Sequence, residues 1–213
     1  MSLLFTDQTD EWALLVADTV VTLEDKPYMF GSKVTALPHL NMTVSTLGSH
    51  LVGMSWRNVI DTTPGLVDIE TVNEVAPGQL RRLWDEYNAA YEQFPMTSTV
   101  YHHGFPAGSN KIVSYAYRST NDFEPERFEG SQFTVKPVLP DFQYQRPQSQ
   151  QEVIDLAIRV RDMNHEQLGH GWGVRIGGDL IATMVQNGHI ETALWHRFDD
   201  YDESVAAMPR PMG

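Results

Sequence analysis

The stretch that decides the fold is Ser2–Thr22, SLLFTDQTDEWALLVADTVVT, at the start of the chain. It consists of a short apolar run at residues 3–5, a polar segment at residues 6–10 and a second, mainly apolar run at residues 12–21. Apolar runs of this length on both sides of a polar turn are typical of the two strands of a β-hairpin. The sequence therefore predicts that the protein opens with a β-hairpin over residues 2–22.

Short strands and two helices are predicted to follow the hairpin. Residues 33–46 alternate between apolar and polar side chains, with Pro38 at the junction of two short strands. From Gly48 the apolar spacing changes to that of a helix ending near Asp61. Residues 79–94 predict a stronger helix, because apolar side chains recur there every three or four residues and make one continuous face.

Strands return in the second half of the chain, on either side of a further helix. Residues 98–101 and 111–118 are predicted strands, joined by a turn-rich segment at residues 106–110. Ser149 and Glu152 have the spacing of a capping box, whose side chains satisfy N–H groups at the start of a helix. Asn187-Gly188 is typical of a tight hairpin turn and is predicted to link strands at residues 180–186 and 189–198.

The order of these segments predicts the fold class. Strands arrive in blocks rather than alternating with helices, which argues against a doubly wound parallel sheet. We expect an α+β fold in which two antiparallel sheets pack together and helices cover both outer faces. Because no internal repeat or linker divides the chain, residues 1–213 are expected to form a single domain, with an acidic tail containing proline and methionine at about residues 199–213.

Composition excludes several classes of function. The 213 residues include 15 basic and 28 acidic side chains, a net charge of −13, so nucleic acids and anionic lipid surfaces would repel the chain. The absence of cysteine excludes disulfides, thiolate nucleophiles, zinc–thiolate sites and iron–sulfur clusters. No apolar run approaches the length of a membrane span, and residues 1–10 lack the features of a signal peptide. We therefore expect a cytoplasmic protein with no nucleic-acid or membrane partner.

Motifs that resemble ligand sites fail on spacing. Residues 169–173 (GHGWG) lack the third glycine position of a dinucleotide-binding loop, and no strand clearly leads into them. His165 and His170 are five residues apart, so they cannot share a zinc ion on one face of a helix. His102 and His103 are expected on opposite faces of one strand. We therefore expect neither a cofactor nor a metal ion.

Four of the first fifty residues mark a candidate chemical site. Ser2 stands at the start of the first strand, Asp18 ends the second, Lys33 opens the third, and Gly48 lies where strand gives way to helix. This arrangement resembles the proteasome β-subunits and the related bacterial protease subunits of the N-terminal-nucleophile (Ntn) hydrolase family. The order of elements is similar over most of the chain. The resemblance implies a four-layer αββα sandwich and assembly into an oligomer, either of this chain alone or with other protein subunits.

The resemblance also implies a role for each residue. The Ser2 hydroxyl would be the nucleophile, and its own α-amine the proton acceptor. An α-amine titrates with a pKa of about 7.7–8.0, close to cellular pH, which suits a general base. Lys33 would favour the alkoxide by its charge, Asp18 would hold Lys33 in place, and the Gly48 N–H would bind the developing oxyanion. Ser131 would supply a supporting hydroxyl near the amine.

Two hypotheses about function stay open at this point. Serine follows Met1 directly, whereas the family prefers a threonine that many members expose by cleaving a propeptide. With Met1 attached, Ser2 has no free amine. The acidic residue that the family carries after its third helix also has no clean counterpart in residues 165–170. The protein is therefore either an N-terminal-serine hydrolase of amides or peptides within an oligomer, or a catalytically silent subunit with a structural role in a larger assembly.

Overall fold

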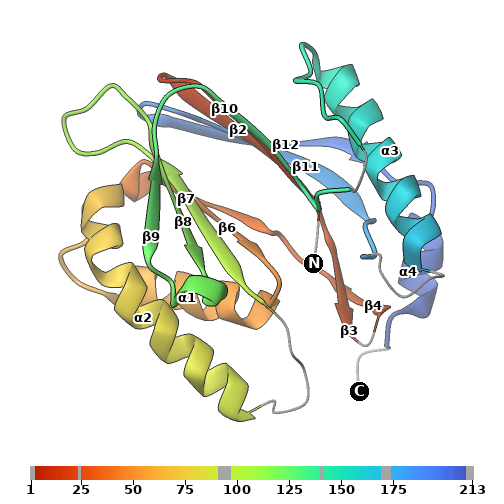
Figure 1. The fold of residues 1–213 in the computed structure, drawn as a ribbon, viewed down its shortest axis with the longest axis horizontal. Helices are drawn as coiled ribbons and strands as arrows, with labels where there is room; N and C mark the ends of the chain where they lie inside the picture. The colour runs from red at the N-terminus through yellow and green to blue at the C-terminus, as the bar shows by residue number, and fades with distance from the viewer. Residues whose placement is uncertain (1–2, 24, 91–96, 140–141, 169–173, 210–213) are drawn as a thin grey trace.

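The computed structural model describes residues 3–23, 25–90, 97–139, 142–168 and 174–209. Within them, three antiparallel sheets and four α-helices make up the fold (Figure 1). The first sheet has the strand order β10 (Gln132–Lys136), β1 (Leu4–Gln8), β2 (Trp12–Asp18), β11 (Asp179–Gln186) and β12 (His189–Arg197). The second sheet has the order β5 (Val34–Leu37), β6 (Met42–Leu47), β7 (Thr99–Gly104), β8 (Val113–Arg118) and β9 (Pro125–Phe128). The third sheet pairs β3 (Val20–Leu23) with β4 (Lys26–Phe30).

Helices lie on the outer faces of the two larger sheets. α1 (His50–Thr62) and α2 (Ile69–Ala90) pack on the second sheet, and α3 (Gln150–Leu168) packs on the first (Figure 1). α4 (Tyr201–Ala207) follows β12 and contacts β4. No helix in the described part of the chain combines the length and the apolar character that crossing a membrane requires.

The opening hairpin is confirmed for β1 and β2, whose antiparallel register pairs Leu4 with Ala17. β1 is buried along its whole length because strands flank it on both sides and side chains cover both of its faces. The chain leaves the first sheet after β2, earlier than predicted. There the N–H groups of Thr19 and Val20 both donate to the carbonyl of Gly177, which turns the chain toward the third sheet.

α2 begins at Ile69, well before the predicted helix start at Gln79. The pair Pro77-Gly78 predicts a break in the helix, because proline lacks the N–H of a helical hydrogen bond. The helix nevertheless continues through the proline, because its apolar residues before and after that point form one buried face: Ile69, Val72, Ala76, Leu80 and Leu83. The last predicted positions, 91–94, lie outside the described residues.

The expectation of a four-layer αββα sandwich was wrong. The structure is a sheet-rich, mostly antiparallel α+β fold with a third sheet, β3–β4, against which α4 packs. The stretch expected to be an acidic tail contains α4 instead, and the Tyr201 ring of this helix stacks on Phe30 of β4 at a centroid distance of 4.8 Å. β4, β9 and β10 have only four or five residues each, too few for a clear apolar pattern in the sequence.

His102 of β7 is buried between the second sheet and α1. The Trp56 indole N–H donates a 2.9 Å hydrogen bond to His102 Nε2, and the two rings stack with their centroids 5.8 Å apart. Burial lowers the pKa of His102 to about 3, with a smaller contribution from neighbouring His103. The imidazole is therefore neutral in the folded protein near pH 7, with its proton on Nδ1.

Stability is expected to fall as the pH drops below about 6.5, the pKa of a histidine in an unfolded chain. In this range the unfolded chain binds a proton at His102 that the folded protein does not bind until about pH 3. The free energy of unfolding should therefore lose about 1.4 kcal/mol per pH unit from this residue alone. Urea denaturation between about pH 7 and about pH 5 measures the slope. His102→Phe should reduce the slope by about this amount, and His39→Gln, at an exposed position, should not. Equal slopes for His102→Phe and wild type would contradict the prediction.

Candidate active site

A buried ion pair between Asp18 and Lys33 joins the two larger sheets. Asp18 ends β2 in the first sheet, and Lys33 immediately precedes β5 in the second. The Lys33 Nζ lies 2.5 Å from Asp18 Oδ1, with 5% of the lysine side chain and 0% of the aspartate side chain exposed. The structure thus brings together two residues that the sequence analysis placed in one site.

The Asp18 carboxylate also binds two backbone N–H groups. Oδ1 accepts from Leu3 N at 2.9 Å, and Oδ2 accepts from Gly177 N at 3.1 Å. The Leu3 N–H belongs to the peptide unit that joins Ser2 to the rest of the chain, and Ser2 itself lies outside the described residues. One carboxylate therefore holds three groups in place: the backbone at the start of β1, the backbone before β11 and the ammonium of Lys33.

Burial dominates the electrostatics of the ion pair. Desolvation lowers the pKa of Lys33, and the negative charge of Asp18 and its hydrogen bond oppose that change. A lysine so deeply buried depends on its carboxylate partner to stay charged. Asp18 is therefore a positioning residue that also maintains the charge of Lys33.

His50, the first residue of α1, belongs to this region and was missed by the sequence analysis. Its ring lies over Gly31, because a Cβ added to that glycine would be 2.9 Å from His50 Cε1 and 3.1 Å from Nε2. Burial, and to a smaller extent the charge of Lys33, lowers the pKa of His50. No local motif reveals this histidine, since Gly31 lies in a separate loop and only the fold brings the two together.

Gly48 occupies a position that requires glycine. Its φ of +90° is unfavourable for residues with a Cβ, and an added Cβ would overlap the carbonyl oxygen of Thr97. Thr46, two residues earlier, donates its N–H to the Lys33 carbonyl at 3.1 Å, so Gly48 lies at the same end of the second sheet as Lys33. Among the described residues, no backbone carbonyl accepts from the Gly48 N–H. This is the N–H that the resemblance assigned to the developing oxyanion.

The structure does not bring Ser131 to this end of the fold. Ser131 immediately precedes β10, which runs antiparallel to β1 and pairs Gln132 with Gln8. Ser131 therefore lies beyond the far end of β1, about 20 Å along the strand from Leu3. Its hydroxyl accepts a 2.6 Å hydrogen bond from Arg146. Its position does not support the role that the resemblance implied for it.

Comparisons with known proteins find similarity in fold alone. No family model matches the sequence, and no curated protein matches it. The fold is similar to that of Anbu proteins. The Anbu (ancestral beta-subunit) from Yersinia bercovieri matches with a TM-score of 0.61 and 11% identity, over 96% of this chain and 90% of that chain. An Anbu (Gly-1) mutant from Hyphomicrobium sp. strain MC1 matches with a TM-score of 0.55 and 9% identity, over 97% of this chain and 94% of that chain.

These comparisons correct the family that the sequence analysis suggested. Two of the matching solved structures are Anbu proteins, which are proteasome-like but distinct from the proteasome β-subunits and bacterial protease subunits that the first fifty residues resemble. That assignment was therefore wrong. At 11% identity the similarity establishes a proteasome-like fold, and the chemistry must be argued from the site.

Proposed function

We propose that this protein is an N-terminal-serine hydrolase of amide or peptide bonds that acts as a subunit of a larger assembly. The observation that carries the proposal is the Asp18 carboxylate, which binds the buried ammonium of Lys33 and the Leu3 N–H at the same time. A buried cation and the first peptide unit of the chain's opening strand are thereby held close to one side chain. A cation beside the residue that precedes Leu3 suits stabilisation of an alkoxide on Ser2.

Each residue of the site has a defined role in this chemistry. After removal of Met1, the free α-amine of Ser2 accepts the hydroxyl proton while Oγ bonds to the carbonyl carbon of the substrate. Lys33 stays charged and stabilises the negative Oγ, and the Gly48 N–H donates to the oxyanion of the tetrahedral intermediate. The leaving amine takes the proton from the α-ammonium as the C–N bond breaks, which leaves an ester on Ser2. Water then attacks the ester carbon while the α-amine accepts the proton of the water. The C–Oγ bond breaks, the α-ammonium returns the proton to Oγ, and the acid leaves.

The α-amine is a better base than either neighbouring side chain. The Lys33 ammonium is bound to Asp18 at 2.5 Å, so its role is that of a fixed charge. His50 has its ring against Gly31, at a position that suits a wall of the substrate site. An α-amine with a pKa of about 7.7–8.0 keeps an unprotonated fraction near neutral pH, and that fraction can accept the proton.

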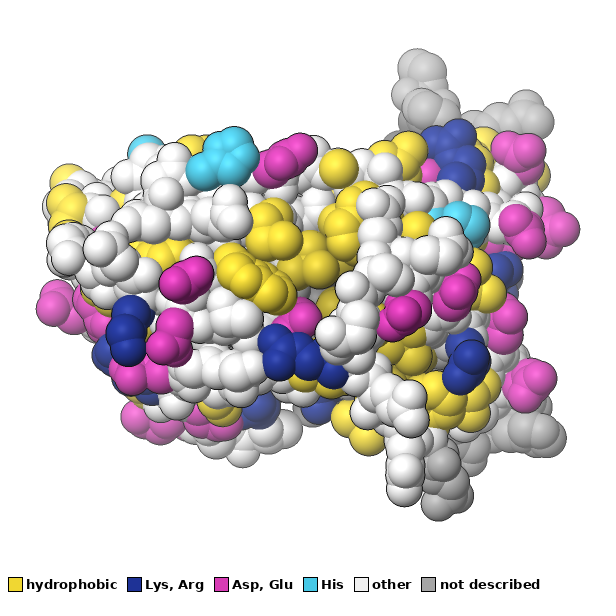
Figure 2. Space-filling model, turned by 90° about the horizontal axis from the view of Figure 1, so that it is seen from above, with side chains coloured by type: hydrophobic (Ala, Val, Ile, Leu, Met, Phe, Trp, Pro, Cys, Tyr) yellow, Lys and Arg dark blue, Asp and Glu magenta, His cyan; other side chains and the backbone are white. Residues whose placement is uncertain are grey.

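Assembly is the second part of the proposal. One protein of similar fold is named an ancestral beta-subunit, a name that implies a complex of several subunits. Hydrophobic side chains gather in the middle of the face shown in Figure 2, over the first sheet. Leu194 of β12, a strand of the first sheet, is 56% exposed. Gathered apolar side chains of this kind are typical of surfaces that another chain covers, here a copy of this chain or another subunit.

Covalent labelling tests the nucleophile. A β-lactone is expected to acylate Ser2 in protein that lacks Met1, because ring opening needs no other leaving group. Ser2→Ala should abolish labelling, whereas Ser131→Ala, which removes the other serine that the sequence suggested, should leave it intact. Intact-mass spectrometry reads both the added label and the state of Met1.

The outcomes separate the two hypotheses. Labelling that persists in Ser2→Ala overturns Ser2 as the nucleophile. Quantitative retention of Met1 in protein from the native source removes the base, and favours a catalytically silent subunit. Loss of the label in Ser2→Ala, together with its retention in Ser131→Ala, supports the hydrolase.

A further inference from the structure

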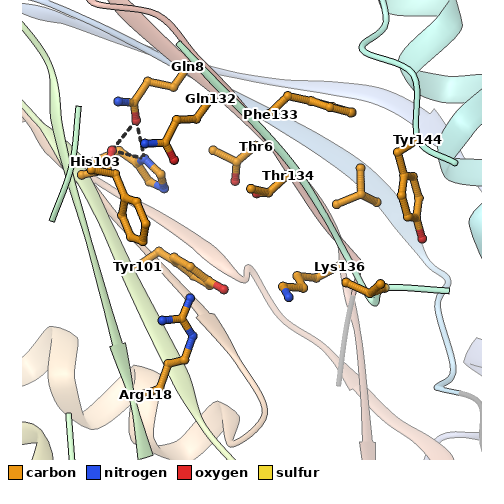
Figure 3. Close-up of a pocket in the computed structure, with 14 residues that line it drawn as sticks. Thr6, Gln8, Tyr101, His103, Arg118, Gln132, Phe133, Thr134, Lys136 and Tyr144 are labelled. Atoms are coloured by element: carbon orange, nitrogen blue, oxygen red, sulfur yellow. Dashed lines mark hydrogen bonds between the residues drawn. The ribbon is translucent and has the colours of Figure 1, made fainter. Parts of the chain in front are cut away.

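A cavity lies between the two larger sheets beside the edge strand β10, and neither Asp18 nor Lys33 lines it. Its volume of about 450 Å³ falls within the range of about 300–1,000 Å³ typical of small-molecule sites. Figure 3 shows side chains from both sheets around it, among them Gln8 and Lys136 from the first sheet and His103 from the second. The cavity is therefore a candidate binding site that the proposed hydrolysis does not use.

A chain of hydrogen bonds fixes the orientation of His103 in this cavity. The Gln8 amide N–H donates to the Gly130 carbonyl at 3.3 Å, which leaves Gln8 Oε1 as an acceptor. The Ser114 hydroxyl donates to that oxygen, and His103 Nδ1 lies 2.6 Å from Ser114 Oγ and 3.4 Å from Gln8 Oε1. Because the Ser114 proton is already committed to Gln8, both oxygens near Nδ1 act as acceptors. Nδ1 therefore carries the proton, and Nε2 carries the lone pair.

The Nε2 lone pair of His103 has no donor within the described residues. The residue is only 4% exposed, and Nε2 is buried without a hydrogen-bond partner. Figure 3 shows the ring between Gln8, which binds one nitrogen, and the cavity. Burial lowers the pKa of His103 to about 4, so Nε2 remains an acceptor near pH 7. An unpaired buried acceptor is costly, and an O–H or N–H group of a ligand would satisfy it.

Lys136 brings a positive charge to the same cavity. Its side chain points into the cavity in Figure 3, and no carboxylate in the described ranges forms an ion pair with it. Arg118, the other cation in the lining, is already paired with Glu126. In a chain with a net charge of −13, a cation that pairs with no carboxylate of the described residues favours an anionic ligand in this cavity.

Apolar groups complete the lining. Val138, which follows β10, lines the cavity and is 64% exposed. The rings of Tyr144 and Phe128 also contribute to the walls. These surfaces would be covered by the apolar body of a ligand, since removing apolar surface from water is favourable.

We propose that this cavity binds a small anionic molecule that carries a hydroxyl or N–H donor on a compact apolar body. The anionic group pairs with Lys136, and the donor binds His103 Nε2. A hydroxybenzoate is the simplest compound of this class. The site stands apart from the amide hydrolysis proposed above and does not depend on it.

Three related probes test the parts of this proposal. 4-Hydroxybenzoate carries both the anion and the donor, benzoate lacks the hydroxyl donor, and 4-hydroxybenzamide lacks the charge. Calorimetric titration of the full chain is expected to show 4-hydroxybenzoate binding at least about tenfold more tightly than either of the others. In wild-type protein with ¹⁵N-labelled histidine, the same probe should shift the His103 Nε2 resonance, because the lone pair gains a donor.

Two lysine variants locate the bound probe. Lys136→Gln should weaken 4-hydroxybenzoate binding at least about tenfold. Lys111→Gln, which removes an exposed lysine paired with Asp10, should leave it unchanged, and thermal unfolding verifies that both variants are folded. Equal binding of the three probes, an unmoved His103 resonance or full binding by Lys136→Gln would each overturn the assignment. An absence of saturable binding at about 10 mM probe would overturn it as well.

Discussion

Asp18→Asn is expected to lower the free energy of unfolding by about 3–5 kcal/mol, because it leaves the buried Lys33 ammonium without a counter-charge. Asparagine keeps the size of the side chain but only one of its two oxygen acceptors. The N–H groups of Leu3 and Gly177 each bind a different oxygen of Asp18, so one of these bonds is lost. The burial that lowers the pKa of Lys33 would then act without opposition and favour the neutral amine. Urea denaturation near neutral pH measures the loss.

The same substitution is expected to lower kcat/KM for a peptide amide by about 10²–10³-fold, because a neutral lysine cannot stabilise the alkoxide. Asp10→Asn is the matched control, since Asp10 lies in the same opening hairpin and forms a surface ion pair with Lys111. The double variant Asp18→Asn, Lys33→Met should recover stability without recovering activity, because it removes the uncompensated charge. If Asp18→Asn is no more destabilising than Asp10→Asn, the ion pair does not hold the site as described.

Gly48→Ala is expected to destabilise the protein by about 2–5 kcal/mol, through backbone strain and overlap with the backbone just before β7. Its φ of +90° disfavours alanine, and the new Cβ would overlap the Thr97 carbonyl oxygen, which cannot rotate away as a side chain could. Any relaxation must move the Gly48 N–H, so hydrolysis of an amide should fall further than stability alone predicts.

Gly188→Ala separates the cost of backbone strain from the cost of the overlap with Thr97. Gly188, in the turn between β11 and β12, also has a positive φ of +74°, but a Cβ there meets nothing within 4 Å. It should therefore show only the conformational cost of about 1–2 kcal/mol. Chemical denaturation of both variants gives the difference. Equal losses would mean that the contact with Thr97 relaxes freely.

The part of the site that lies at strand ends could be predicted from the sequence. Asp18 and Lys33 stand where apolar patterns stop and start, and Gly48 stands where the spacing changes from strand to helix. These transitions are local, so the sequence reveals them. The 2.5 Å contact between Asp18 and Lys33 crosses from one sheet to the other, and no local pattern reveals such a contact.

The parts that were missed depend on segments far apart in the chain. His50 contacts Gly31 of a separate loop, and Gly177 reaches Asp18 from the segment before β11. Ser131 was assigned from its place in the order of elements, but it precedes β10 and so lies at the far end of the strand. The third sheet was missed because β3 and β4 pair with each other outside the two larger sheets, so their burial pattern is irregular.

The Asp18–Lys33 ion pair also lies at the base of the β3–β4 hairpin. Asp18 and Lys33 flank the segment 19–32, so their contact closes that segment into a loop. The entropic cost of closing a flexible loop rises only with the logarithm of its length, by about 0.6 kcal/mol for each doubling. The hairpin can therefore lengthen, shorten or accept an inserted peptide near Asp25 while its base keeps its shape. The length of this hairpin can thus change without altering the contact between Asp18 and Lys33.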